Sequence, residues 1–186
     1  MFYLNAAQKI SDVLGITSAF NKSTIDRVES NLSSKDSLML IISDSYLEMD
    51  AYLEENDRKS VSALLACGGW VEGLYLATKV AAQSSKNNQI LNHIADQKLS
   101  LENLLGLLSD YPNDETILSM ISSLNALKSI FDKIEMKAPE NQKVTVDPTT
   151  KVATIGGDNQ KPAAISAEIL KDITEKTAEI RSSIIN

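Results

Sequence analysis

The sequence predicts an all-α protein: an up-and-down bundle of about five long helices, with two short helices before them and a small β-hairpin before the last. Three observations carry this prediction. Apolar residues recur at intervals of three and four along most of the chain. The polar stretches between these segments are short, which favours antiparallel neighbouring helices. One stretch, residues 57–83, is apolar or small on nearly every side, which is typical of a buried central helix.

The periodic segments give the helices in order. Residues 2–14 form an amphipathic segment that ends before Gly15, and residues 24–32 form a second one with Asn21 or Ser23 as its cap. Asn56 is a good cap for the central helix. The long helices are expected over residues 34–55, 57–83, 89–108, 114–137 and 164–185. We treat residues 1–186 as a single domain, because the length suits one core.

Two of these segments carry apolar faces that we expect to point inward. The first helix has Ala6, Ile10, Val13 and Leu14 on one side. The apolar residues of segment 34–55 recur at helical spacing, with one serine among them: Leu38, Ile41, Ile42, Ser45, Tyr46, Met49 and Leu53. The acidic residues of that segment are expected to form its solvated face.

The central stretch carries a ridge of small residues at helical steps: Ser62, Ala66, Gly69, Gly73, Ala77 and Ala81. A glycine inside a helix costs about 1 kcal/mol relative to alanine, so close packing against another helix is expected to compensate. On this interpretation Gly69→Leu or Gly73→Leu destabilises the fold by overpacking. The stretch is also long enough to cross a bilayer. Glu72 would then lie near the middle of the membrane at high cost, so we interpret the stretch as a helix of a soluble bundle.

Residues 138–161 have a different character. Two arms rich in β-branched residues, 143–147 and 151–155, flank a turn that begins Asp147-Pro148. This pattern predicts a β-hairpin inserted within the single domain.

Charge and rare residues exclude several function classes. The net charge of -7 argues against nucleic acid as a partner, which requires clustered Lys and Arg. Cys67 is the single cysteine and His93 the single histidine, so intrachain disulfides, zinc fingers and Cys/His zinc enzymes are excluded. We expect no cofactor, no metal site and no catalytic constellation.

The cluster that could carry chemistry lies in the central stretch. Glu72, Tyr75 and Lys79 fall at successive helical steps and share a face, with Trp70 nearby. These four residues either form a ligand-binding site or serve the packing of the bundle, and the sequence leaves both readings open. Cys67 lies among Leu, Ala and Gly, which favours a buried structural thiol over a nucleophile.

The segment Asn56-Asp57-Arg58 with residues 66–77 (ACGGWVEGLYLA), and the earlier segment from Asp36 to Tyr46, resemble uncharacterised helical proteins of the bacterial cell envelope that are predicted to be lipoproteins. The resemblance covers about residues 5–135. It implies an exported protein in the periplasm or cell envelope, with a lipid anchor upstream, and it implies no activity. The start of the chain lacks the basic region of a secretory signal, so the alternative is a cytoplasmic protein.

We therefore expect a non-enzymatic helical bundle that binds a protein or a cell-envelope component, with no nucleic-acid partner and no transmembrane span in this chain. The alternative is a small-molecule sensor or enzyme with a pocket near Trp70, Glu72 and Tyr75.

Overall fold

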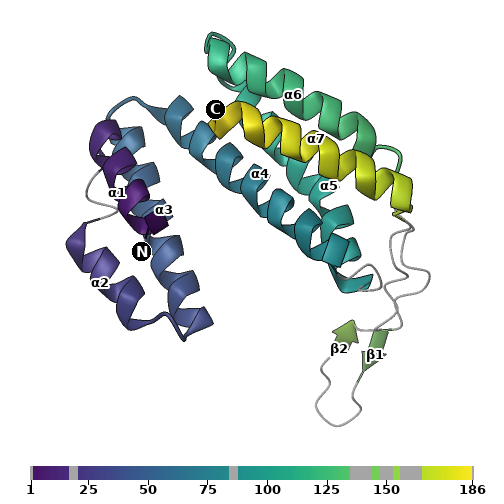
Figure 1. The fold of residues 1–186 in the computed structure, drawn as a ribbon, viewed down its shortest axis with the longest axis horizontal. Coiled ribbons are helices and arrows are strands. Elements are labelled where there is room, and N and C mark those ends of the chain that lie inside the picture. Colours follow the sequence, from purple (N-terminus) through teal and green to yellow (C-terminus); the bar gives the residue numbers. More distant parts are fainter. Residues whose placement is uncertain are drawn as a thin grey trace. The chain divides into compact units, whose positions relative to one another are not determined.

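The computed structural model describes residues 2–16, 21–83, 88–134, 144–146, 153–155 and 165–185. Apart from two three-residue strands, the regular secondary structure within these ranges is helical, which confirms the predicted all-α class (Figure 1). Its contacts divide into two compact units, Met1–Ala66 and Cys67–Asn186. The boundary falls inside α4 (Lys59–Gln83), which runs through it as one helix. Each unit is described by itself.

The first unit contains α1 (Phe2–Leu14), α2 (Lys22–Ser30) and α3 (Lys35–Glu55). The side chain of Asn21 caps α2 by accepting the N–H of Thr24, and that of Ser34 caps α3 by accepting the N–H of Ser37. The core of this unit is small. It consists of Ile16, Met49 and Leu53, with Leu14, Tyr52, Val61 and Leu65 packed against them.

The turn between α3 and α4 corrects one prediction. Asn56 does not cap α4; it ends α3, and its side-chain amide donates to the carbonyl of Tyr52 at 2.7 Å. Asp57 adopts a left-handed conformation with φ of 56°, and the N–H of Arg58 donates back to the carbonyl of Leu53 at 2.7 Å. This is the common way for a helix to end. Arg58 also donates to the carbonyl of Leu14, which ties the end of α1 to this turn.

The second unit contains the rest of α4 together with α5 (Asn88–Ser109), α6 (Glu115–Phe131) and α7 (Ala167–Ile185). Helices that follow one another in sequence pack together: α5 against α6, and α6 against α7 (Figure 1). Their inner faces are mainly aliphatic, with one buried phenylalanine, and their buried residues lie at the predicted helical spacing. The fully buried large residues of these three helices are Ile94, Leu101, Leu108, Ile117, Leu124, Leu127, Phe131, Ile173 and Ile180.

The predicted hairpin falls mainly outside the described residues. Within them, β1 (Val144–Val146) pairs antiparallel with β2 (Ala153–Ile155), with Thr145 opposite Thr154. The turn and the remainder of 138–161 lie outside the described ranges. The hairpin as a whole therefore stays a prediction, and the fold shown is the set of helices.

The small-residue ridge expected on α4 is only partly buried: Ala81 is buried, whereas Ala66, Gly69 and Gly73 are exposed. Cys67, Val71, Leu74, Thr78 and Ala81 are buried on one side of the helix. On the other side Ala66, Gly69, Gly73, Leu76 and Val80 are exposed. A Cβ placed on Gly73 would meet no described atom within 4 Å. The prediction of tight packing at Gly73 is therefore wrong for the part of the chain that the structure describes.

By length and composition alone, α4 is the one helix among the described residues that could cross a membrane, and 28% of its most apolar stretch is buried. Core helices of soluble proteins meet the same criteria. The expectation that this chain has no transmembrane span stays a prediction.

Two other apolar faces are only partly buried. In α1, Ile10 is 58% exposed and Val13 is 88% exposed, although both were expected to point inward. In α3 the buried residues are Ile41, Ser45, Met49 and Leu53, whereas Ile42 and Tyr46 are exposed. The apolar periodicity predicted the position of the inner face of α3 correctly, but the face that is buried is narrower than predicted.

Candidate functional site

Glu72 of α4 forms a two-pronged ion pair with Arg181 of α7. The Nε of Arg181 donates to Oε2 of Glu72 at 2.5 Å, and its Nη2 donates to Oε1 at 3.3 Å. The Glu72 side chain is 43% exposed and the Arg181 side chain is 30% exposed, so water reaches both partners of the pair. The pair joins two helices that are 109 residues apart in the chain.

Tyr75 lies next to this pair, and two cationic side chains lie over its ring. The guanidinium carbon of Arg181 is 4.5 Å from the centroid of the Tyr75 ring, and the Nζ of Lys79 is 4.9 Å from it. Both distances are within the range of cation–π attraction. The structure thus brings together Glu72, Tyr75 and Lys79, as their spacing suggested, and adds Arg181. Sequence reasoning missed Arg181 because no local pattern indicates which helix lies opposite Glu72.

Trp70 is not part of this cluster. It is two residues from Glu72 on the same helix, which places the two side chains about 200° apart around the axis. The indole Nε1 of Trp70 donates to the Oε1 of Gln97 in α5 at 3.1 Å, and Gln97 donates in turn to the backbone carbonyl of His93 at 3.2 Å. Trp70 therefore serves as a half-buried contact between α4 and α5, with its polar edge satisfied.

The remaining reactive side chains have no catalytic arrangement among the described residues. Cys67 is fully buried, and this burial raises its pKa to about 11. The thiol is therefore protonated at neutral pH and is a weak nucleophile. His93 is exposed on α5. Within the described ranges, no group of three or more His, Cys, Asp or Glu side chains could hold a metal ion.

The Glu72–Arg181 pair is expected to stabilise the fold only slightly. Because both side chains are partly exposed, water screens their attraction, and exposed pairs typically have coupling energies of about 0.2–1 kcal/mol. A double-mutant cycle of Glu72→Gln and Arg181→Gln, followed by urea denaturation, measures this coupling. The more exposed pair Lys171–Glu175 of α7 is the control, and we expect it to have a coupling of at most about 0.5 kcal/mol. A coupling above about 2 kcal/mol for Glu72–Arg181 would contradict this interpretation and indicate a desolvated pair.

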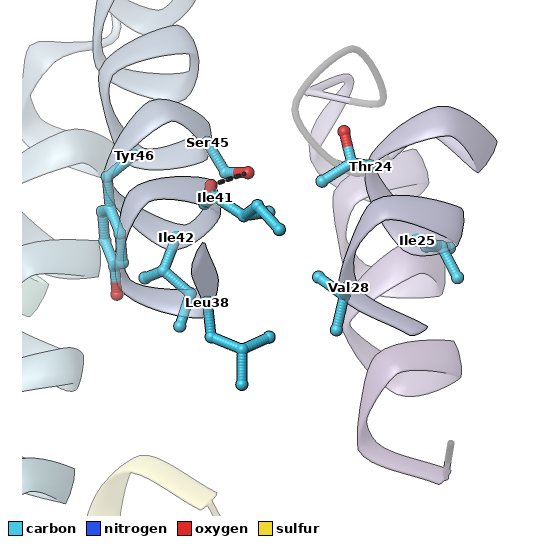
Figure 2. Close-up of a pocket in the computed structure, with 8 residues that line it drawn as sticks. All are labelled: Thr24, Ile25, Val28, Leu38, Ile41, Ile42, Ser45 and Tyr46. Carbon is cyan, nitrogen blue, oxygen red and sulfur yellow. Dashed lines mark hydrogen bonds between the residues drawn. The ribbon is translucent and has the colours of Figure 1, made fainter. Parts of the chain in front are cut away.

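A second feature, which the sequence did not single out, is an apolar pocket in the first unit. It lies between α2 and α3 and has a volume of about 130 Å³. In Figure 2, Thr24 and Val28 of α2 face Leu38 and Ile41 of α3 across it. The complete lining is Thr24, Ile25, Val28, Leu38, Ile41, Ile42, Ser45 and Tyr46.

Three hydroxyls line the α2–α3 pocket: those of Ser45 and Thr24 have hydrogen-bond partners within the protein, and the third belongs to Tyr46, which is 46% exposed. Ser45 Oγ donates to the carbonyl of Ile41 at 2.9 Å, drawn as a dashed line in Figure 2. Thr24 Oγ1 donates to Oδ1 of Asn21 at 3.5 Å. None of the lining residues is charged. The signal in the sequence was the small Ser45 within the apolar face of α3, because a short side chain at an inward position leaves space.

The two flanks of the α2–α3 pocket differ in character. On one flank, Arg27 of α2 donates to Asp44 of α3 at 3.3 Å. Ile42 is two residues before Asp44 and therefore lies about 200° away around α3, on the other flank. Ile42 and Tyr46 on that flank are 51% and 46% exposed, and Met39 beside them is 58% exposed. One side of the pocket is thus bordered by an ion pair and the other by exposed apolar side chains.

Comparisons with known proteins add no family assignment: no family model, no curated protein and no solved structure matches this chain. The resemblance to envelope proteins therefore stays a prediction.

Proposed function

We propose that this protein acts by binding another polypeptide, without catalysis, through an apolar surface of its first unit. That surface is the α3 strip, which we define as Met39, Ile42 and Tyr46. The three residues are spaced by three and four positions, so they follow one another along a single side of α3.

The exposure of the α3 strip is the observation that carries the proposal. Its three side chains are 46–58% exposed and lie beside the open flank of an apolar pocket. Single exposed apolar residues are common, but a contiguous apolar surface with a recess is characteristic of interaction sites. Methionine and tyrosine are also enriched at protein interfaces relative to the rest of the surface.

The alternative, a small-molecule sensor or enzyme centred on Trp70, Glu72 and Tyr75, has less support. Both oxygens of Glu72 accept hydrogen bonds from Arg181, and the indole N–H of Trp70 donates to Gln97. The polar groups that would recognise a ligand there are engaged within the protein. We include a location in the cell envelope in the proposal, and its only support is the sequence resemblance.

Photo-cross-linking tests the proposed function. We expect p-benzoylphenylalanine at Tyr46 to give a discrete adduct with another polypeptide in the cells that make this protein. The control is the same amino acid at Leu118 of α6, which is 47% exposed and therefore equally accessible. Adducts of the same pattern from both positions, or none from Tyr46, would contradict binding at the α3 strip.

A further inference from the structure

We propose that the α2–α3 pocket receives one apolar side chain of a basic amphipathic helix. This inference rests on the proposed function and specifies the chemistry of the partner. It joins three observations on the first unit: the size of the pocket, its uncharged and mainly apolar lining, and the charge of α3.

The volume indicates a single side chain rather than a whole ligand. Pockets for drug-sized molecules typically enclose about 300–1,000 Å³. The α2–α3 pocket encloses about 130 Å³. An engineered protein cavity of about 150 Å³ holds one benzene molecule, so this pocket matches one Leu or Phe side chain.

The lining selects an apolar occupant. Ser45 Oγ donates to the carbonyl of Ile41 at 2.9 Å, and Thr24 Oγ1 lies 3.5 Å from Oδ1 of Asn21, so both hydroxyls have partners within the protein. The remaining lining is aliphatic, with the ring of Tyr46 at the exposed flank. A polar group placed there would lose its hydrogen bonds to water without replacement, whereas an apolar side chain gains from leaving water.

The α3 strip continues the pocket along the helix. A partner that fills the pocket with one side chain can place further apolar side chains on Ile42, Tyr46 and Met39. This is the arrangement of an amphipathic helix in an apolar groove, where residues at steps of three and four act as anchors. Such interfaces concentrate their binding energy in a central side chain that fills a pocket.

The charge of α3 selects a basic partner. The helix has one basic residue, Lys35, and six acidic residues, so its formal charge is −5. The acidic residues are Asp36, Asp44, Glu48, Asp50, Glu54 and Glu55. Lys and Arg on the flanks of the partner would complement this charge and speed the encounter. A second copy of this chain has a net charge of -7 and is disfavoured. An anionic membrane surface is disfavoured for the same reason.

The test uses the full chain with isotope-labelled methyl groups and a synthetic helical peptide of about 15 residues with leucine on one face and lysine on the other. We expect saturable shifts in the NMR signals of the Val28, Leu38 and Ile41 methyl groups. A peptide with alanine in place of leucine is expected to cause no such shifts. A peptide with glutamate in place of lysine is expected to bind at least about tenfold more weakly. Absence of binding by the leucine–lysine peptide would overturn the inference.

Two matched pairs of variants locate the site. Ser45→Leu fills the pocket, whereas Ser43→Leu adds the same atoms at an exposed position of the same helix. Ile42→Glu places a charge beside the pocket, whereas Leu47→Glu places it at a 70% exposed position away from it. We expect Ser45→Leu and Ile42→Glu to weaken peptide binding at least about tenfold and the two controls to leave it nearly unchanged. Ile42→Glu and Leu47→Glu change only exposed residues, so their comparison still locates the site if the Ser45→Leu variant does not fold.

Each other result has a defined meaning. If Ile42→Glu and Leu47→Glu weakened peptide binding equally, the inference that the peptide binds at the pocket would be overturned, and the weakening would be a general effect of the added charge. If raising the protein concentration caused the same methyl shifts, the occupant would be a second copy of this chain and the inference would be overturned. If phosphatidylcholine vesicles caused them, the occupant would be a membrane and the inference would also be overturned. Loss of peptide binding with an intact Tyr46 cross-link would remove this inference and leave the proposed function standing. Loss of the cross-link alone would remove the proposed function, while peptide binding would still show the pocket's selectivity.

Discussion

Phe131→Ala is expected to lower the free energy of unfolding of the second unit by about 3–5 kcal/mol. Phe131 ends α6, is fully buried and has the largest side chain among the fully buried residues that the structure describes. Its removal costs the transfer free energy of the ring and leaves a cavity that the surrounding aliphatic side chains fill only in part. Urea denaturation followed by the fluorescence of Trp70 measures the effect, because Trp70 is the single tryptophan and lies in the same unit.

Leu118→Ala is the matched control for Phe131→Ala. Leu118 lies on the same helix but is 47% exposed, so we expect a loss below about 1 kcal/mol. A loss of similar size in both variants would contradict the assignment of Phe131 to the core.

The second prediction concerns two small residues of α4 that are expected to respond in opposite ways. Gly73→Ala should raise the free energy of unfolding by about 0.5–1 kcal/mol, because alanine favours the helix and no described atom lies within 4 Å of the new Cβ. Ala81→Leu should lower it by about 1–3 kcal/mol, because Ala81 is fully buried and a larger side chain overpacks the core.

The free energy of unfolding of both α4 variants is measured by urea denaturation, followed by the fluorescence of Trp70, which lies on the same helix. Helix propensity accounts for the expected gain at Gly73 but disfavours Ala81→Leu only slightly, so a loss of about 1–3 kcal/mol at Ala81 indicates overpacking. A destabilising Gly73→Ala would mean that another helix closely approaches this face, and it would restore the small-residue ridge as a packing surface.

The sequence determined the local structure of this protein. Apolar residues at steps of three and four located the seven helices found among the described residues, because burying one face is the main source of helical stability in proteins. Asn21, Ser34 and Asp114 act as helix caps, where a side-chain oxygen accepts an otherwise unsatisfied backbone N–H. The face shared by Glu72, Tyr75 and Lys79 also followed from the sequence, because residues three and four apart are neighbours on any helix.

The tertiary structure alone decided which faces are covered. The pairing of Glu72 with Arg181 spans 109 residues, and helical periodicity carries no information on which helix lies opposite. For the same reason, the apolar sides of α4 and α3 could not be divided into buried and exposed parts from the sequence: Leu74 is buried whereas Leu76 is exposed, and Ile41 is buried whereas Ile42 is exposed. The α2–α3 pocket arises because the short Ser45 and Thr24 lie among larger side chains where two helices meet, and that volume exists only once both helices are in place.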